Sequence, residues 1–303
     1  MEKRVKKNNN WKFLLSKEEI ETMRKGVFKK SKYNFPILIP KEFITYLEEL
    51  DATANLKAKA LLLYAGVILV YKEAYHTYRV HHLNLEVICQ FLGIKYSEKL
   101  RKLFSKNSYL VKNQYITDTF DYPIAYEYSY IKDEKSSKNI YLPRYIMKKS
   151  LSQDELEKKL TYKRLQLPSK SIEPTRHTKG VFEKKGNNYQ LVVEPLDING
   201  GKYITIDYKT IKDVVYEEFS APALYVGCVI KDMLANKITT SRTRFRTSKS
   251  QLAKKVSMGE STFDKYHREL RRYTRESYRL SQETFKSKEG FVSEVYLYFD
   301  CRF

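Results

Sequence analysis

Residues 247–273, TSKSQLAKKVSMGESTFDKYHRELRRY, decide the fold that we expect for the second half of this chain. Ser248 is a typical N-cap for a first short helix, and Met258-Gly259 interrupts the helical pattern. A second helix then starts near Glu260. Because its apolar residues return at helical spacing, we expect a buried face made of Phe263, Tyr266 and Leu270.

The order helix, tight turn, helix resembles the helix-turn-helix class of DNA-binding motifs. The resemblance rests on a small residue in the first helix, Ala253, on a turn four residues later at Ser257, and on the apolar Phe263 in the second helix. Members of the class favour glycine where Ser257 stands, whereas here Gly259 comes two residues later. A helical hairpin without DNA contact is the alternative.

This segment is strongly basic. From Lys237 to Leu280 there are 13 Lys and Arg against 4 Asp and Glu, a net charge of +9 in a chain of +21. Basic surfaces attract polyanions through counterion release. Solvated lysines in a chain of biased composition are the alternative, but this segment is rich in arginine. The resemblance implies DNA contacts in this half from Arg242, Arg244, Arg246, Lys249, Ser261, Thr262, Lys265, Arg268, Arg271, Arg272, Lys286 and Lys288.

A hairpin follows the two helices. Residues 283–299, ETFKSKEGFVSEVYLYF, predict two strands with their turn at Lys288-Glu289-Gly290. A strongly apolar helix is expected ahead of the pair, over residues 221–237. Helix, helix-turn-helix and hairpin in this order resemble a winged helix.

The first half of the chain repeats this plan. We predict helices over 43–50, 56–75, 85–92 and 96–104, and strands over 36–40, 109–115 and 123–130. Gly93 marks the turn between the third and fourth helices. A similar strand and helix, 203–206 and 211–219, precede the second set. The repeated order favours duplication of one unit, and two unrelated helical domains are the alternative.

We therefore expect an α+β fold, mainly helical, with two winged helix-turn-helix domains in tandem. A length of 303 residues suffices for two domains. The expected division is a basic N-terminal arm and lead-in over 1–32, a first winged-helix domain over 33–147, a basic linker over 148–188, and a second winged-helix, DNA-binding domain over 189–303.

The first domain is less basic than the second. Residues 85–112 carry 6 basic and 2 acidic side chains, a net charge of +4. The candidate DNA contacts of this domain are Lys99, Arg101, Lys102 and Lys106. We expect the second domain to be the main DNA reader.

Composition excludes several other classes. The N-terminus MEKRVKKNNNWKF has no apolar core segment, and the longest apolar run, 60–71, is shorter than the roughly 20 residues that span a bilayer. Cys89, Cys228 and Cys301 are too few and too widely spaced for a disulfide framework or a zinc motif. We expect a cytoplasmic protein with no membrane partner, no metal and no cofactor.

The 26 tyrosines raise an enzymatic alternative, in which a tyrosine hydroxyl attacks a phosphodiester as in tyrosine recombinases and nicking replication proteins. The residue three after His267 is Leu270 rather than arginine, and His81-His82 lacks the intervening hydrophobe of the nicking motif. No phosphate-binding loop is present. We therefore expect no enzyme activity, and tyrosines that build strands.

Two winged helices, a basic linker and a basic arm resemble the replication initiators of bacterial plasmids and phages, over residues 36–299. The resemblance implies sequence-specific binding of double-stranded DNA by both domains, with host replication proteins and a homodimer as candidate partners. A transcriptional regulator with tandem winged helices has the same order of elements. An adaptor whose first domain binds protein is a third alternative.

Overall fold

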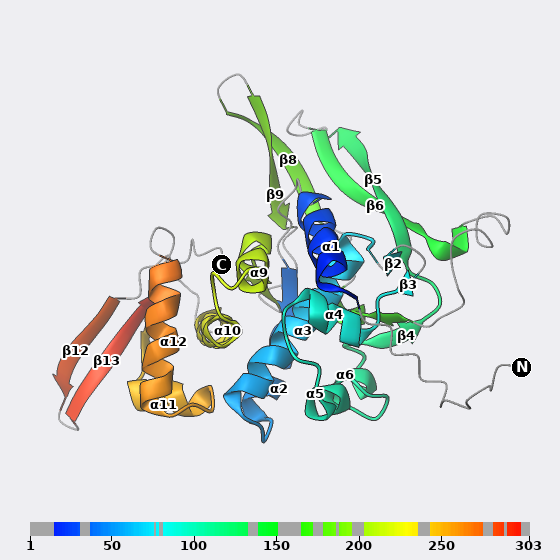
Figure 1. Ribbon diagram of the computed structural model, residues 1–303. Helices are drawn as coiled ribbons and strands as arrows, with labels where there is room; N and C mark the ends of the chain where they lie inside the picture. The colour runs from blue at the N-terminus through cyan, green and yellow to red at the C-terminus, as the bar shows by residue number, and fades with distance from the viewer. Residues whose placement is uncertain are drawn as a thin grey trace, which may run out of the picture.

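The computed structural model describes residues 15–30, 37–75, 77–78, 81–132, 139–150, 165–171, 178–185, 188–195, 203–235, 243–274, 281–287 and 290–297. Across these residues the fold is α+β, with more helix than strand and with small antiparallel sheets. Helices occupy the centre of the molecule, and the longer hairpins project around them (Figure 1).

The first half begins with α1 and ends with the hairpin of β5 and β6. Its elements are α1 (Lys17–Lys30), β1 (Ile37–Pro40), α2 (Lys41–Glu49), α3 (Ala54–Lys72), β2 (Thr77–Tyr78), β3 (His81–His82), α4 (Leu85–Phe91), α5 (Glu98–Leu103), α6 (Tyr109–Lys112), β4 (Thr117–Thr119), β5 (Pro123–Lys132) and β6 (Asn139–Met147). All four helices predicted here are confirmed, with shifted ends.

One predicted strand of the first half is wrong. Residues 109–115 begin with the helix α6 because the Ser108 hydroxyl accepts a hydrogen bond from the Val111 backbone N–H at 3.3 Å and so caps a helical turn. The arm and lead-in expected over 1–32 also contain a packed helix, α1, whose Met23 and Val27 are fully buried. Residues 1–14 lie outside the described residues.

The second half contains the remaining elements. They are η1 (Lys148–Ser150), β7 (Leu165–Leu167), β8 (Thr178–Lys185), β9 (Asn188–Pro195), β10 (Tyr203–Ile206), α9 (Tyr208–Val215), α10 (Ala221–Ala235), β11 (Thr243–Arg246), α11 (Lys249–Lys255), α12 (Glu260–Tyr273), β12 (Ser281–Ser287) and β13 (Gly290–Leu297). The predicted hairpin is confirmed, since β12 and β13 pair antiparallel up to Ser287 opposite Gly290.

Helix α3 forms the centre of the core. It is apolar on every side, and the 19 residues from Ala54 to Lys72 would suffice by length and composition to cross a membrane. In the fold, 78% of the most apolar 18-residue stretch of this helix is buried. This confirms the prediction of a central buried helix.

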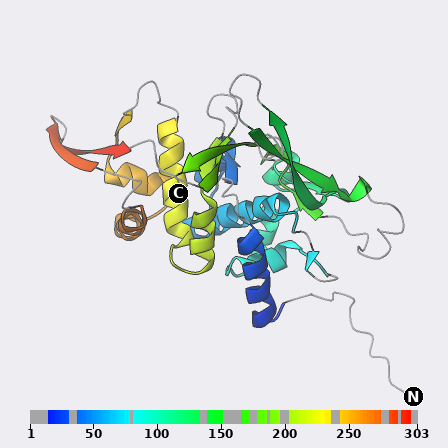
Figure 2. The same cartoon turned by 90° about the horizontal axis from the view of Figure 1, so that it is seen from above.

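The two halves share one core. Strand β1 pairs antiparallel with β10, from Ile37 opposite Ile206 to Pro40 opposite Tyr203. Helix α3 packs against α10, and both contribute to one continuous cluster of buried apolar side chains. Figure 2 shows α3, in light blue, meeting α10, in yellow, in the middle of the molecule. The halves are therefore held together by sheet pairing and by apolar burial.

The range 148–188 differs from the exposed linker that we expected. Strand β7 pairs with β4, and β8 joins β6 in the sheet of order β5-β6-β8-β9. Leu167 is buried, and the Ser171 hydroxyl donates a hydrogen bond to the Leu38 carbonyl at 3.0 Å. Because strand pairing and side-chain burial engage these residues, the expectation of an exposed spacer is wrong for 165–171. The helical piece expected over 152–163 lies outside the described residues.

Candidate nucleic-acid interface

Helix α11 is fixed at its start by a reciprocal cap. The Ser248 hydroxyl accepts a hydrogen bond from the Gln251 backbone N–H at 3.1 Å, and the Gln251 side-chain oxygen accepts one from the Ser248 N–H at 3.3 Å. The prediction of Ser248 as N-cap is confirmed. Leu252, Ala253 and Val256 are buried, so one face of α11 is packed into the core.

The turn between α11 and α12 is made at Ser257, whose φ is +56°. This left-handed conformation suits glycine and is uncommon for other residues. Two backbone hydrogen bonds close the turn, from Ser257 N–H to the Lys254 carbonyl and from Met258 N–H to the Ala253 carbonyl, each at 2.9 Å. Gly259 has an ordinary φ of −69° and precedes α12 as its N-cap. The glycine-favouring position is therefore Ser257.

Helix α12 has one buried face and one exposed basic face. Phe263, His267 and Leu270 are buried, while Tyr266, which we expected to be buried, is half-buried. The exposed candidates for DNA contact on α12 are Ser261, Thr262, Lys265, Arg268, Arg271 and Arg272. We call the four cations of this set, Lys265, Arg268, Arg271 and Arg272, the basic face of α12. Their exposure leaves them available to an anionic partner.

Asp264 is the acidic neighbour of this face. Its carboxylate forms an ion pair with Lys249 at the start of α11, and its backbone carbonyl accepts a hydrogen bond from Arg268 Nε at 3.3 Å. Lys249 is half-buried as well as paired. The structure thus gives Lys249 a role in joining α11 to α12, while Arg268 keeps its other guanidinium nitrogens for a partner.

A three-stranded sheet of order β11-β13-β12 lies beside α12 (Figure 1). Arg244 and Arg246 lie on β11, where they pair with Tyr296 and Glu294 of β13. Lys286 lies on β12, one position before the end of the pairing. The remaining candidates Arg242 and Lys288 lie outside the described residues.

His267 belongs to the core of this region. Its exposed fraction is 8%, and its ring stacks on Phe263 with the centroids 5.4 Å apart. Burial, aided by the positive charge of Arg271, lowers the pKa of His267 from 6.5 to about 4. The imidazole is therefore neutral at pH 7, and its Nε2 has no hydrogen-bond partner among the described residues. Sequence reasoning considered His267 for catalysis and missed this packing role.

The first half contains the same turn between α4 and α5. Gly93 has a φ of +71°, and its N–H donates to the Gln90 carbonyl at 3.1 Å. Ile94 N–H donates to the Cys89 carbonyl at 2.9 Å, five residues back, as Met258 does to Ala253. Aligning Cys89 with Ala253 therefore superposes the left-handed residue and both backbone hydrogen bonds of the two turns.

Helix α5 differs from α12 in its charges. Lys99, Lys102 and Lys106 are exposed. Arg101, in contrast, donates two parallel hydrogen bonds to the Glu98 carboxylate, from Nε to Oε2 at 2.7 Å and from Nη2 to Oε1 at 2.6 Å. An arginine engaged in this way presents less unpaired charge to a phosphate.

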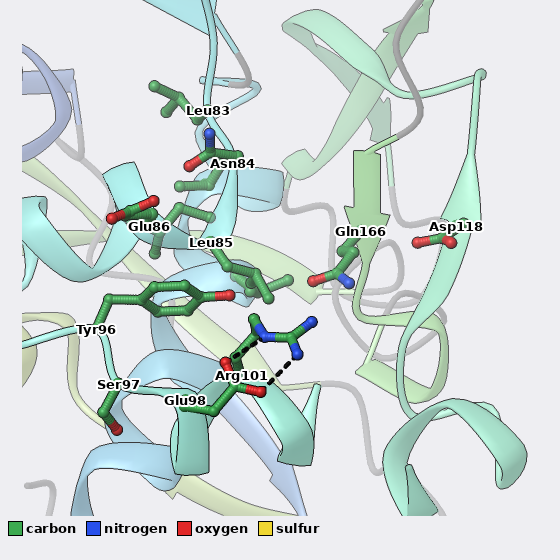
Figure 3. Close-up of a pocket in the computed structure, with 13 residues that line it drawn as sticks. Leu83, Asn84, Leu85, Glu86, Tyr96, Ser97, Glu98, Arg101, Asp118 and Gln166 are labelled. Carbon is green, nitrogen blue, oxygen red and sulfur yellow. Dashed lines mark hydrogen bonds and ion pairs between the residues drawn. The ribbon is translucent and has the colours of Figure 1, made fainter. Parts of the chain in front are cut away.

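A cleft of about 730 Å³ lies beside this pair. Figure 3 shows Arg101 and Glu98 at the cleft, with Glu86 and Tyr96 on one side and Gln166 and Asp118 on the other. Three carboxylates and one guanidinium therefore line it, a balance that disfavours a phosphate group there.

Among the described residues, no three histidine, cysteine, aspartate or glutamate side chains come together in a group that could hold a metal ion. Comparisons with protein-family models, with curated proteins and with solved structures find no match to this chain.

Proposed function

We propose that this chain is a sequence-specific double-stranded DNA-binding protein that reads DNA with α12. The observation that carries the proposal is the basic face of α12 on a helix whose opposite face is packed into the core. A helix held in this way presents its exposed side chains in fixed positions, as a recognition helix in a major groove must.

The surrounding elements support a winged-helix interpretation of the second half. Helix α10, strand β11, helices α11 and α12, and the hairpin of β12 and β13 follow in the order of a winged helix. The sheet order β11-β13-β12 matches as well, because the strand before α11 pairs with the last strand of the hairpin. The shared turn geometry at Gly93 and Ser257 supports a related unit in the first half, with α5 at the place of α12.

Within this class we propose a cytoplasmic replication initiator of plasmid or phage type. A shared core joins the two units, which suits a protein that places both against one DNA site. A transcriptional regulator with two such units is the second candidate. Footprinting on the DNA that flanks the coding region separates the two, since iterated direct repeats favour an initiator and a single divergent promoter favours a regulator.

The test of DNA reading uses the footprinted duplex. Lys265→Ala and Arg268→Ala should weaken binding by about 1 to 3 kcal/mol where the side chain reads a base, or lower the slope of log affinity against log salt by about 0.9 where it contacts a phosphate. The matched control is Lys212→Ala, because Lys212 is an exposed cation that belongs to α9 and not to α12. If both α12 variants bind as the unaltered chain does, α12 is not the recognition helix.

A second DNA titration tests whether the first unit also binds DNA. Lys99→Ala combined with Lys102→Ala removes two exposed cations of α5. A shallower salt slope and a shorter footprint would place α5 on DNA. An unchanged slope and footprint would confine DNA binding to α12 and favour a protein-binding role for the first unit.

A further inference from the structure

Lys57 of α3 is a buried lysine that joins the two halves of the chain. Its exposed fraction is 1%. Its ammonium donates hydrogen bonds to the Glu48 backbone carbonyl at 2.9 Å and to the Ser257 hydroxyl at 2.8 Å. The first acceptor lies in the last turn of α2 in the first half, and the second is the left-handed residue of the turn before α12.

Other charged groups meet at the same place. The Glu48 carboxylate forms an ion pair with Lys255 of α11 at 2.7 Å, and its side chain is only 10% exposed. Asp232 of α10 is 5% exposed, and its charge acts on both Glu48 and Lys255. We call Glu48, Lys57, Asp232, Lys255 and Ser257 the junction cluster. It brings together α2 and α3 with α10, α11 and the turn.

A buried ammonium is costly unless its hydrogen bonds are made, whereas an apolar side chain of similar size would fill the same volume without that cost. Unlike an apolar side chain, the lysine fixes the relative positions of the segments around it, because its hydrogen bonds require acceptors at defined positions. Ser257 sets the angle between α11 and α12. A hydrogen bond from α3 to the Ser257 hydroxyl therefore ties the position of α12 to the first half.

We propose that Lys57 is a positioning residue for DNA recognition, which holds the turn before α12 in a fixed place relative to the first half through its hydrogen bond to Ser257. The inference rests on the proposed function for its effect on DNA. Its structural part, the coupling of the turn to the first half, can be measured without DNA.

The structural part is tested by double electron–electron resonance in the full chain. Spin labels are placed at two exposed positions, Asn107→Cys in the first half and Lys254→Cys on α11. The native Cys89 and Cys228 are buried, and Cys301 is replaced by serine. We expect Lys57→Met to broaden the distance distribution.

Two further variants accompany Lys57→Met. The matched control is Lys59→Met, the same change two residues along α3, which should leave the distribution narrow. Because Lys57→Met also changes the core, Ser257→Ala is measured in parallel, since it removes only the acceptor hydroxyl. Circular dichroism confirms that each variant is folded. A narrow distribution for folded Lys57→Met and Ser257→Ala overturns the proposal.

The functional part is tested by titration of the footprinted duplex. We expect Lys57→Met and Ser257→Ala to weaken specific binding by about three- to tenfold, the size of one typical intramolecular hydrogen bond, with no change for Lys59→Met. Binding to unrelated DNA should stay the same, because the basic face of α12 is intact.

The outcomes separate the two proposals. Broad distances with unchanged specific affinity overturn the positioning role and leave the proposed function standing. If the unaltered chain binds no duplex, the proposed function fails, and with it the DNA role of Lys57, whatever the distances show. Broad distances together with a selective loss of specific affinity in both variants support the inference.

Discussion

The stability of the fold should fall between pH 7.5 and pH 5 because of His267. Its pKa is lowered from 6.5 to about 4, with burial as the main cause and Arg271 and Lys249 adding to it against the charge of Asp264. A group with a lowered basic pKa is neutral in the fold and takes up a proton more readily in the unfolded chain. The stability is therefore fully present above pH 6.5 and is lost as the pH falls toward 4.

The size of the effect follows from the two pKa values. At pH 7.5 both states of the chain carry a neutral His267, so the contribution is close to zero. At pH 5 the unfolded chain is almost fully protonated at this position, while the folded chain is about one-tenth protonated. The difference destabilises the fold by about 2 kcal/mol, and the loss approaches about 3 kcal/mol below pH 4.

Urea denaturation followed by circular dichroism measures this at pH 7.5 and at pH 5.0, for the unaltered chain and for His267→Leu. Leucine has a similar volume and does not titrate. The buried carboxyls Glu48 and Asp232, whose pKa values are raised by burial, also respond to pH, but they do so equally in both chains. The difference between the two chains should therefore shift by about 2 kcal/mol. Parallel pH dependence in both would refute the burial argument.

Three more outcomes follow from the packing around these helices. Phe263→Ala removes a side chain that is 2% exposed and should lower the free energy of unfolding by about 3 to 5 kcal/mol, measured by urea denaturation. Gly93→Ala should lower the free energy of unfolding by about 1 kcal/mol because of its left-handed φ of +71°, measured in the same way. Burial raises the pKa of both Cys89 and Cys228 to about 12, so neither thiol should react with a disulfide reagent at pH 8 unless urea is added.

Local patterns in the sequence were enough to predict most helices and the hairpin at the end of the chain. The apolar run of α3 predicts a central helix, and the strand over 203–206 is found with the predicted bounds as β10. Ser248 works as a cap because its partner, Gln251, is only three residues away. Capping, periodicity and hairpin turns all depend on residues that are close together in the chain, so they can be recognised in the sequence.

Contacts between distant residues could not be predicted in this way. The pairing of β7 with β4, and of β1 with β10, joins segments with no shared local pattern. The same holds for Lys57, whose partner Ser257 lies 200 residues further along the chain. The polar, proline-containing range 148–188 resembles a linker by its local pattern. Its pairing with β4 and β6 depends on residues elsewhere in the chain, which the local pattern does not reveal.

The two similar turns lead into helices that differ in length and in exposed positive charge. Gly93 adopts its left-handed conformation freely, whereas Ser257 does so at a cost of about 1 to 2 kcal/mol and receives a hydrogen bond from the core. Helix α5, which follows Gly93, has six residues, and its Arg101 is ion-paired with Glu98. Helix α12 has 14 residues and four exposed cations. The turn that is tied to the first half is thus the one that leads to the longer, more basic helix. This is what we expect if α12 is the main DNA reader and its placement matters more than that of α5.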